Sequence, residues 1–169
     1  RTQELPAGEV GEYATWGPHV FLGYYDNTEA SWEAKDQDRW YYSADLCLKD
    51  EDGFVLYVDR IKDIVNRGGI KISALEVENM LAQHPGVQNA AIVAVPDDRL
   101  GERACAFIVP RPGHEVTLQS LGAFLDSQGV TKQKWPEQLE IVPQLPFTAT
   151  GKIQKNLLRD SLEARIKDA

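Results

Sequence analysis

The sequence is poor in the residue types that mark secreted, metal-binding and membrane-spanning proteins. Its 169 residues include only two cysteines, Cys47 and Cys105, which stand far apart without a CxxC spacing or partner histidines. This pattern predicts neither a disulfide framework nor a metal site, and it favours a reducing, cytoplasmic setting. No apolar run approaches the roughly 20 residues of a membrane helix. Residues 1–6 lack the basic and apolar regions of a signal peptide, so we expect neither export nor a transmembrane segment.

An excess of positive charge is also absent. The 18 lysines and arginines are outnumbered by 26 aspartates and glutamates, which gives a formal net charge of −8. A chain with this balance repels nucleic-acid backbones and anionic membrane surfaces. We therefore expect no nucleic-acid partner, and any anionic ligand has to be held by a local group of positive side chains.

The first third of the chain is rich in aromatic residues and turns. The sequence Glu51-Asp52-Gly53 predicts a hairpin turn, because glycine adopts positive φ without a steric cost. A sheet of this size leaves strand edges unpaired, so residues 1–59 are predicted to form an incomplete antiparallel β subdomain. Alternating patterns between turn residues predict one short helix at 28–34 and strands at 11–16, 20–25, 40–48 and 54–58.

From residue 60 the pattern changes to alternating strands and helices. Ser73 and Thr117 are predicted helix N-caps, and the helices after them carry apolar side chains on one face. A last amphipathic helix is expected after residue 152. Residues 60–169 are therefore predicted to form a compact α+β domain, a small mixed sheet with helices. Its strands are expected at 61–65, 70–72, 89–95, 103–109 and 140–142.

One segment places a lysine at the end of an ordered turn. Proline, threonine and glycine between residues 146 and 151 indicate a solvent-facing turn, and Lys152 follows it just before the last helix. A lysine ammonium is a compact charge on a flexible stem, which suits it to an oxyanion or a phosphate. By composition alone, however, the simpler interpretation is a surface lysine at a helix start.

Two further segments form a series with this turn. Residues 40–46 read Trp-Tyr-Tyr-Ser-Ala-Asp-Leu, and residues 59–72 read Asp-Arg-Ile-Lys-Asp-Ile-Val-Asn-Arg-Gly-Gly-Ile-Lys-Ile. Residues 145–155 read Leu-Pro-Phe-Thr-Ala-Thr-Gly-Lys-Ile-Gln-Lys. In this order the three segments resemble signatures of the adenylate-forming superfamily, which includes acyl-CoA synthetases, peptide-synthetase adenylation domains and beetle luciferases. The resemblance covers essentially the whole chain.

This resemblance implies roles for three charged residues at a nucleotide. Lys152 would bridge the substrate carboxylate and the α-phosphate of ATP while an acyl adenylate forms. Asp45 would accept hydrogen bonds from the ribose hydroxyls, and Arg60 would contact the phosphate or the ribose. Considered without the family, Asp45 is a turn-capping carboxylate and Arg60 belongs to an ordinary surface ion pair.

The resemblance also implies a moving domain. Lys62 would be the hinge about which residues 60–169 swing between the adenylating and the thioester-forming arrangement, and residues 1–59 would be the end of the amino-terminal domain. The backbone at Gly68 and Gly69 would line the path of the coenzyme A pantetheine arm. Without the family, Lys62 is a solvent-facing strand residue and the two glycines form a simple hairpin turn.

Two positions depart from the family pattern. Ala44 and Asp59 stand where the family usually has glycine, so a positive φ at either position would cost roughly 1–2 kcal/mol. An additional carboxylate at Asp59 would also place negative charge near the nucleotide. These changes leave Lys152 untouched, but they keep open the alternative of a non-catalytic module that binds a nucleotide or coenzyme A.

The resemblance finally implies a larger enzyme. The phosphate-binding loop and the acid pocket of the family are not found in these residues, so the chain is expected to be an inactive fragment that needs its amino-terminal domain. The expected substrates are Mg-ATP, coenzyme A and a small carboxylic acid, with a fatty acid preferred because the motifs are most similar to short- and medium-chain fatty acid–CoA ligases. A peptide-synthetase-type adenylation domain that loads a carrier protein remains the alternative within the enzymes.

Overall fold

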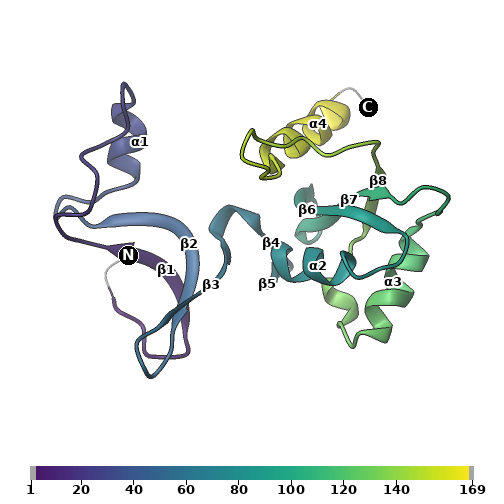
Figure 1. Ribbon diagram of the computed structural model, residues 1–169, viewed down its shortest axis with the longest axis horizontal. Coiled ribbons are helices and arrows are strands. Elements are labelled where there is room, and N and C mark those ends of the chain that lie inside the picture. The colour runs from purple at the N-terminus through teal and green to yellow at the C-terminus, as the bar shows by residue number, and fades with distance from the viewer. Residues whose placement is uncertain (1–2, 168–169) are drawn as a thin grey trace. The chain divides into compact units, whose positions relative to one another are not determined.

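The chain forms two compact units, Arg1–Lys62 and Asp63–Ala169. The computed structural model describes residues 3–167, except for the side chains of Glu163, Ile166 and Lys167 (Figure 1). In chain order the elements are β1 (Val10–Thr15), α1 (Thr28–Glu33), β2 (Tyr41–Lys49), β3 (Val55–Arg60), the 3-10 turn η1 (Ile61–Asp63), β4 (Ile64–Arg67), β5 (Ile70–Ser73), α2 (Ala74–Leu81), β6 (Val87–Asp97), β7 (Gly101–Pro110), α3 (Leu118–Ser127), the 3-10 turn η2 (Lys132–Lys134), β8 (Gln138–Ile141) and α4 (Lys155–Lys167).

The boundary between the units lies three residues beyond the predicted one. The sequence placed it between residues 59 and 60, but β3 continues through Arg60 and pairs there with Asp45 of β2. This ladder keeps residues 59 and 60 in the first unit. The chain then passes through η1, where a strand was expected from residue 61, and β4 begins at Ile64.

The first unit is a three-stranded antiparallel sheet in the order β1-β2-β3. Its β2–β3 turn is the predicted one. Gly53 has φ +88° and donates its N–H to the Asp50 carbonyl over 3.1 Å, and the Asp50 carboxylate accepts from the Phe54 N–H at 2.8 Å. The positive φ explains why glycine stands at this position.

The prediction of a strand at residues 20–25 is wrong. This segment is irregular apart from one isolated bridge between Tyr24 and Asn27. Side chains satisfy its backbone groups: Lys35 Nζ donates to the Phe21 carbonyl at 3.0 Å, and Tyr24 N–H donates to the Ser31 hydroxyl at 2.8 Å. Because these groups have side-chain partners, the segment needs no neighbouring strand.

The second unit contains a five-stranded mixed sheet, as predicted. The strands follow the order β5-β4-β7-β6, and β8 pairs with β7. All pairs are antiparallel except β7–β8, which is parallel. The predicted N-caps are confirmed, since the Ser73 hydroxyl accepts from Glu76 N–H at 3.0 Å and Thr117 forms a capping box with Ser120.

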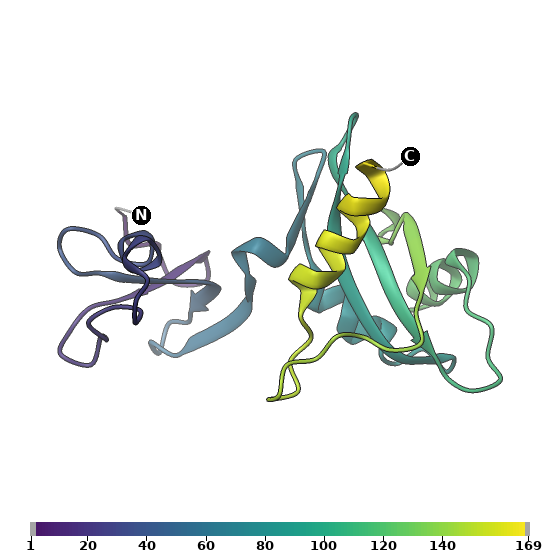
Figure 2. The same ribbon diagram turned by 90° about the horizontal axis from the view of Figure 1, so that it is seen from above.

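The two faces of this sheet bury separate cores, because successive strand residues point to opposite sides. One core joins the sheet to α2 and α3, and the other joins it to α4 (Figure 2). Phe107 lies on the α4 side with Leu158 and Leu162, whereas Ile108 lies on the other side with Leu121. The unit therefore has three layers, and α4 packs on the second face together with Leu145 and Ile153. No helix within residues 3–167 has the length and apolar content needed to cross a bilayer.

The contact between α3 and the Trp135 ring gives a test of this packing. A Cβ built on Gly122 would lie 3.1 Å from Cε3 and Cζ3 of Trp135, whose indole N–H donates to the Val130 carbonyl at 2.9 Å. We expect Gly122→Ala to lower the free energy of unfolding by about 1–3 kcal/mol through overpacking, although alanine is the better helix former. Urea unfolding of the chain measures this change.

The exposed neighbour Ala123 supplies the control. Ala123→Gly changes helix propensity without touching the ring, and it should cost about 1 kcal/mol. If Gly122→Ala stabilised the chain instead, the indole would have to move aside at little cost, and the packing described for α3 would be wrong.

Candidate functional site

Lys152 follows a turn whose backbone is closed by hydrogen bonds. Gly151 N–H donates to the Thr148 carbonyl at 2.9 Å, and Thr148 N–H donates to the Lys152 carbonyl at 2.8 Å. The Thr148 hydroxyl accepts from Lys152 N–H at 3.0 Å, and Gly151 has φ +81°. The side chain of Lys152 is exposed. The backbone of this lysine is therefore held in place, while its ammonium group can follow a ligand.

The residues on both sides of the turn are tied together before α4 begins. Phe147 and Ile153 form an isolated antiparallel bridge. Gln154 N–H donates to the Pro146 carbonyl at 2.8 Å, and its side-chain amide donates to the Phe147 carbonyl at 3.0 Å. Leu145 is buried in the core beneath α4. The turn is thus a short hairpin anchored at its base, and Lys152 lies on its return arm.

Asp45 and Arg60 are brought together in the first unit. They lie opposite each other on β2 and β3, and Asp45 Oδ1 is 3.0 Å from Arg60 Nε. The two side chains are 34% and 44% exposed, so the pair is open to solvent and to a ligand. Arg60 thus forms with Asp45 the kind of ion pair that was expected of it without the family resemblance. A carboxylate has several lone pairs, so Asp45 can accept further hydrogen bonds beside the guanidinium.

Cys47 lies on the same strand as Asp45 but offers no nucleophile. Burial, and then the negative charge of Asp45, raises the pKa of the Cys47 thiol. Burial raises the pKa of the Cys105 thiol further, to about 12. The thiolate is the reactive form of cysteine, so neither side chain is activated for covalent chemistry.

Of the two departures from the family pattern, only Ala44 takes a left-handed backbone. Ala44 has φ +59°, and its N–H donates to the Glu12 carboxylate at 3.3 Å. Asp59 is not one of the described residues that have positive φ. Its side chain is 2% exposed, and its carboxylate accepts from Arg60 N–H at 2.7 Å. Asp59 is therefore a buried part of the β2–β3 ladder and does not face solvent.

The backbone at Ala44 predicts a stabilising substitution. Left-handed φ costs a residue with a Cβ roughly 1–2 kcal/mol, and glycine loses about 0.4–1 kcal/mol more entropy on folding. We expect Ala44→Gly to raise the free energy of unfolding by about 0.5–1 kcal/mol, measured by urea unfolding. Ala14→Gly on β1, where φ is ordinary, should lower it. Equal effects at the two positions would mean that Ala44 is not strained.

Gly68 and Gly69 form the turn between β4 and β5. Their φ values of +56° and +87° are those of a type I′ turn, and Gly68 N–H donates to the Leu100 carbonyl at 2.7 Å. The preceding residue, Arg67, makes a bidentate ion pair with Glu137, with N–O distances of 3.0 and 2.8 Å. A Cβ on Gly69 would meet nothing within 4 Å. The turn conformation alone explains both glycines, and the space beside Gly69 is open.

Sequence reasoning missed a group of charged residues that hold α4. Lys155 Nζ lies 2.8 Å from Glu78 Oε1 and 4.0 Å from Asp63 Oδ2, and Arg159 also pairs with Asp63. The predicted hinge residue, Lys62, immediately precedes this Asp63 and is exposed. One signal for the group was present in the sequence, because Lys155 and Arg159 stand four residues apart and so share one face of a helix.

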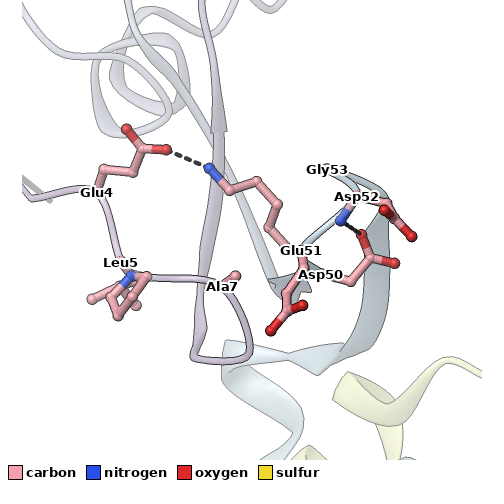
Figure 3. Close-up of a pocket in the computed structure, with 9 residues that line it drawn as sticks. Glu4, Leu5, Ala7, Asp50, Glu51, Asp52 and Gly53 are labelled. Carbon is pink, nitrogen blue, oxygen red and sulfur yellow. Dashed lines mark hydrogen bonds and ion pairs between the residues drawn. The ribbon is translucent and has the colours of Figure 1, made fainter.

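A surface depression of about 670 Å³ lies apart from the predicted site residues (Figure 3). It is formed by residues 4–7 and the β2–β3 turn, and Glu4 pairs there with Lys49. Asp50, Glu51 and Asp52 add further carboxylates. Such a lining repels phosphate groups, so this depression is not a candidate for a nucleotide.

A family model described as the AMP-binding enzyme C-terminal domain matches residues 76–152, a range that ends on Lys152. Curated and solved relatives of the same kind align with more than nine-tenths of the chain. The chain belongs to the adenylate-forming enzymes and carries their carboxyl-terminal domain. The α+β class predicted from the sequence is confirmed by the same comparisons.

The curated relatives of this chain carry different names. It is 47% identical over 163 residues to a medium-chain fatty-acid–CoA ligase of Escherichia coli K12, covering 96% of this chain and 29% of the relative. It is 41% identical over 161 residues to enterobactin synthase component E of the same organism, covering 95% and 30%. The chain therefore spans about 30% of the length of these curated relatives.

Solved structures of adenylate-forming enzymes share the fold. ATP-bound MatB from Rhodopseudomonas palustris superposes with a TM-score of 0.83 at 33% identity, covering 94% of this chain and 31% of that one. The o-succinylbenzoate–CoA synthetase of Bacillus subtilis, in complex with its acyl-adenylate intermediate, gives 0.79 at 30% identity, covering 92% and 31%.

Proposed function

We propose that this chain is the carboxyl-terminal part of an ATP-dependent acid–CoA ligase that activates a fatty acid. In the first step, a carboxylate oxygen attacks the α-phosphorus of ATP, the bond to the β-phosphate breaks, and pyrophosphate leaves. In the second step, the thiol of coenzyme A attacks the acyl carbonyl, loses its proton, and AMP leaves. A larger amino-terminal domain would supply the acid pocket and the phosphate-binding loop.

The observation that carries this proposal is the Lys152 turn. The Lys152 backbone is fixed by its hydrogen bonds with Thr148 across the hairpin, while its side chain is exposed and ends in an ammonium on a flexible stem. Negative charge builds up between the attacking carboxylate and the α-phosphate during the first step. A positive group aimed at that charge stabilises the transition state more than the ground state, which is how such a lysine would accelerate adenylation.

Asp45 and Arg60 fit the nucleotide end of the reaction. The partly exposed Arg60 side chain can donate to a phosphate or a ribose oxygen, and the carboxylate can accept from the two ribose hydroxyls. Magnesium would arrive bound to the phosphate oxygens of ATP, which are the hard ligands that it prefers. The left-handed Ala44 directly before Asp45 would keep the carboxylate where the family's glycine places it.

A fatty acid is the favoured substrate because identity is higher to the medium-chain ligase than to the aryl-acid enzymes. The value is 47% for the former, and it is 41% for the vibriobactin-specific 2,3-dihydroxybenzoate–AMP ligase of Vibrio cholerae and 38% for the Bacillus subtilis 2,3-dihydroxybenzoate–AMP ligase. These latter relatives support a second candidate, an adenylating enzyme that passes an aromatic acid to another thiol.

Acid-dependent pyrophosphate release by the full-length enzyme separates these candidates. The panel contains acetate, octanoate, palmitate, salicylate and 2,3-dihydroxybenzoate, each with Mg-ATP and with or without coenzyme A. Release with octanoate and formation of octanoyl-CoA is the expected result. Release with an aromatic acid but no acyl-CoA would favour the second candidate, and nucleotide binding without release would favour a non-catalytic module.

A further inference from the structure

Four charged side chains gather at the start of α4. Lys155 and Arg159 come from the first two turns of this helix, Glu78 comes from α2, and Asp63 ends η1. Lys155 lies 2.8 Å from Glu78 and 4.0 Å from Asp63, and Arg159 pairs with Asp63. Glu78 Oε1 also accepts from Ile92 N–H on β6 at 2.6 Å. We call Asp63, Glu78, Lys155 and Arg159 the ion cluster.

The ion cluster is sheltered from solvent and electrically balanced. Lys155, Glu78 and Asp63 are only 12–13% exposed, and Arg159 is 22% exposed. Two positive charges face two negative ones. By contrast, the pair between Lys134 and Glu76 in the same unit is 32% and 42% exposed. Removing one charge from a sheltered group leaves its partners unpaired, so the ion cluster should hold its geometry more firmly than an exposed pair does.

The position of Lys155 goes against the local preference of a helix. It is the first residue of α4, where the helix dipole is positive and a cation is unfavourable, and the first turn contains no acidic residue. The cost is offset by Glu78 and Asp63, which approach from other elements. These two contacts therefore hold the first residue of α4 against α2 and η1.

The ion cluster lies between two points that the proposed reaction needs. Lys155 is three residues from Lys152, and the intervening segment is tied back to the hairpin through Gln154, which bonds to the Pro146 and Phe147 carbonyls. At the other end, Asp63 directly follows Lys62 in the chain. A displacement of α4 would therefore move the hairpin that carries Lys152 relative to the start of β4.

We infer that the ion cluster sets the position of Lys152 for acyl-adenylate formation, with Lys155 and Arg159 as positioning residues that act through Lys152. This inference rests on the proposed function, because it takes Lys152 as the group that meets the reacting carboxylate. Lys155 itself does not touch the substrate. Its ammonium is occupied by Glu78 and Asp63, whereas that of Lys152 is exposed.

Kinetics of Lys155→Met in the full-length enzyme test the inference, because methionine keeps an unbranched side chain and removes the charge. The kcat for adenylation should fall about tenfold, since neighbouring groups are commonly coupled and a small misplacement of a group at the reacting atoms is costly. The KM values for ATP and acid should change by less than about threefold. Thioester formation from supplied acyl adenylate should change equally little, and Lys155→Arg should recover most of the adenylation rate.

The double variant distinguishes positioning from a general loss of structure. In a Lys152→Ala background, Lys155→Met should cost less than about twofold more, because residues that act as a unit are not additive. The matched control, Lys134→Met, breaks the exposed pair with Glu76 and should leave adenylation unchanged. Additive losses in the double variant, or an equal loss in Lys134→Met, would overturn the inference.

A second variant covers the case in which Lys155→Met does not fold. Arg159→Gln leaves the Lys155–Glu78 pair in place and should lower adenylation by about threefold, again only when Lys152 is present. An unchanged adenylation rate in folded Arg159→Gln or Lys155→Met contradicts the inference about the ion cluster, and it leaves the proposed role of Lys152 in place. If Lys152→Ala adenylates at the wild-type rate, the proposed role of Lys152 fails instead, whatever the ion cluster does.

Discussion

Replacing Lys152 by alanine is expected to slow acyl-adenylate formation in the full-length enzyme about a hundred- to a thousandfold, which corresponds to about 2.7–4 kcal/mol of barrier. The ammonium stands on a hydrogen-bonded hairpin and is exposed, so alanine removes the charge without disturbing a core. Because the charge matters most in the transition state, kcat should fall more than the KM for ATP rises. Single-turnover pyrophosphate release measures the step directly.

The control for Lys152→Ala is a lysine in the same unit whose side chain is also exposed. Lys132 belongs to η2, and its ammonium lies over the Trp135 ring. Lys132→Ala should leave adenylation within about twofold of wild type. Lys152→Arg should recover only part of the activity, since a planar guanidinium does not replace a compact ammonium. Adenylation by Lys152→Ala at close to the wild-type rate would remove the catalytic role from this residue.

Local signals in the sequence were sufficient for much of the fold. Ser73 and Thr117 were correct as N-caps, and Gly53 was correct as a turn glycine, because each decision depends on a few neighbouring residues. The segment at residues 20–25 shows where this approach fails. Its aromatic, strand-like composition is outweighed by two side-chain hydrogen bonds, one donated by Lys35 to the Phe21 carbonyl and one accepted by Ser31 from the Tyr24 N–H.

The same distinction applies to the candidate site. The motif that contains Lys152 is continuous in sequence, so its hairpin could be expected from proline, threonine and glycine. The ion cluster joins Asp63, Glu78 and Lys155 across 92 positions of the chain, from 63 to 155, and sequence gave no reason to pair them. The sequence predicted strain at Ala44 only if its φ were positive, and the sign of φ depends on the folded backbone of β2.

Asp45→Ala is expected to lower kcat/KM for ATP about ten- to a hundredfold, since a hydrogen bond to a charged group contributes about 1.5–3 kcal/mol. The exposed Asp52 in the neighbouring β2–β3 turn supplies the control, and Asp52→Ala should have no effect on kcat/KM. The Asp45 substitution also breaks the 3.0 Å pair with Arg60, so a loss of activity by itself has two explanations. Steady-state kinetics with ATP as the varied substrate give the size of the effect.

Deoxynucleotides separate the two explanations for Asp45. If its carboxylate accepts hydrogen bonds from the ribose hydroxyls, the wild-type enzyme should prefer ATP to 2′-deoxy-ATP or 3′-deoxy-ATP about tenfold or more, and Asp45→Ala should lose this preference. If Asp45 only orients Arg60, the preference for ATP should survive in Asp45→Ala. The effect of Asp45→Ala on kcat/KM should then vanish in an Arg60→Met background. The open, half-exposed geometry of the pair favours direct contact with the ribose, because the side chain of Asp45 remains 34% exposed beside the guanidinium.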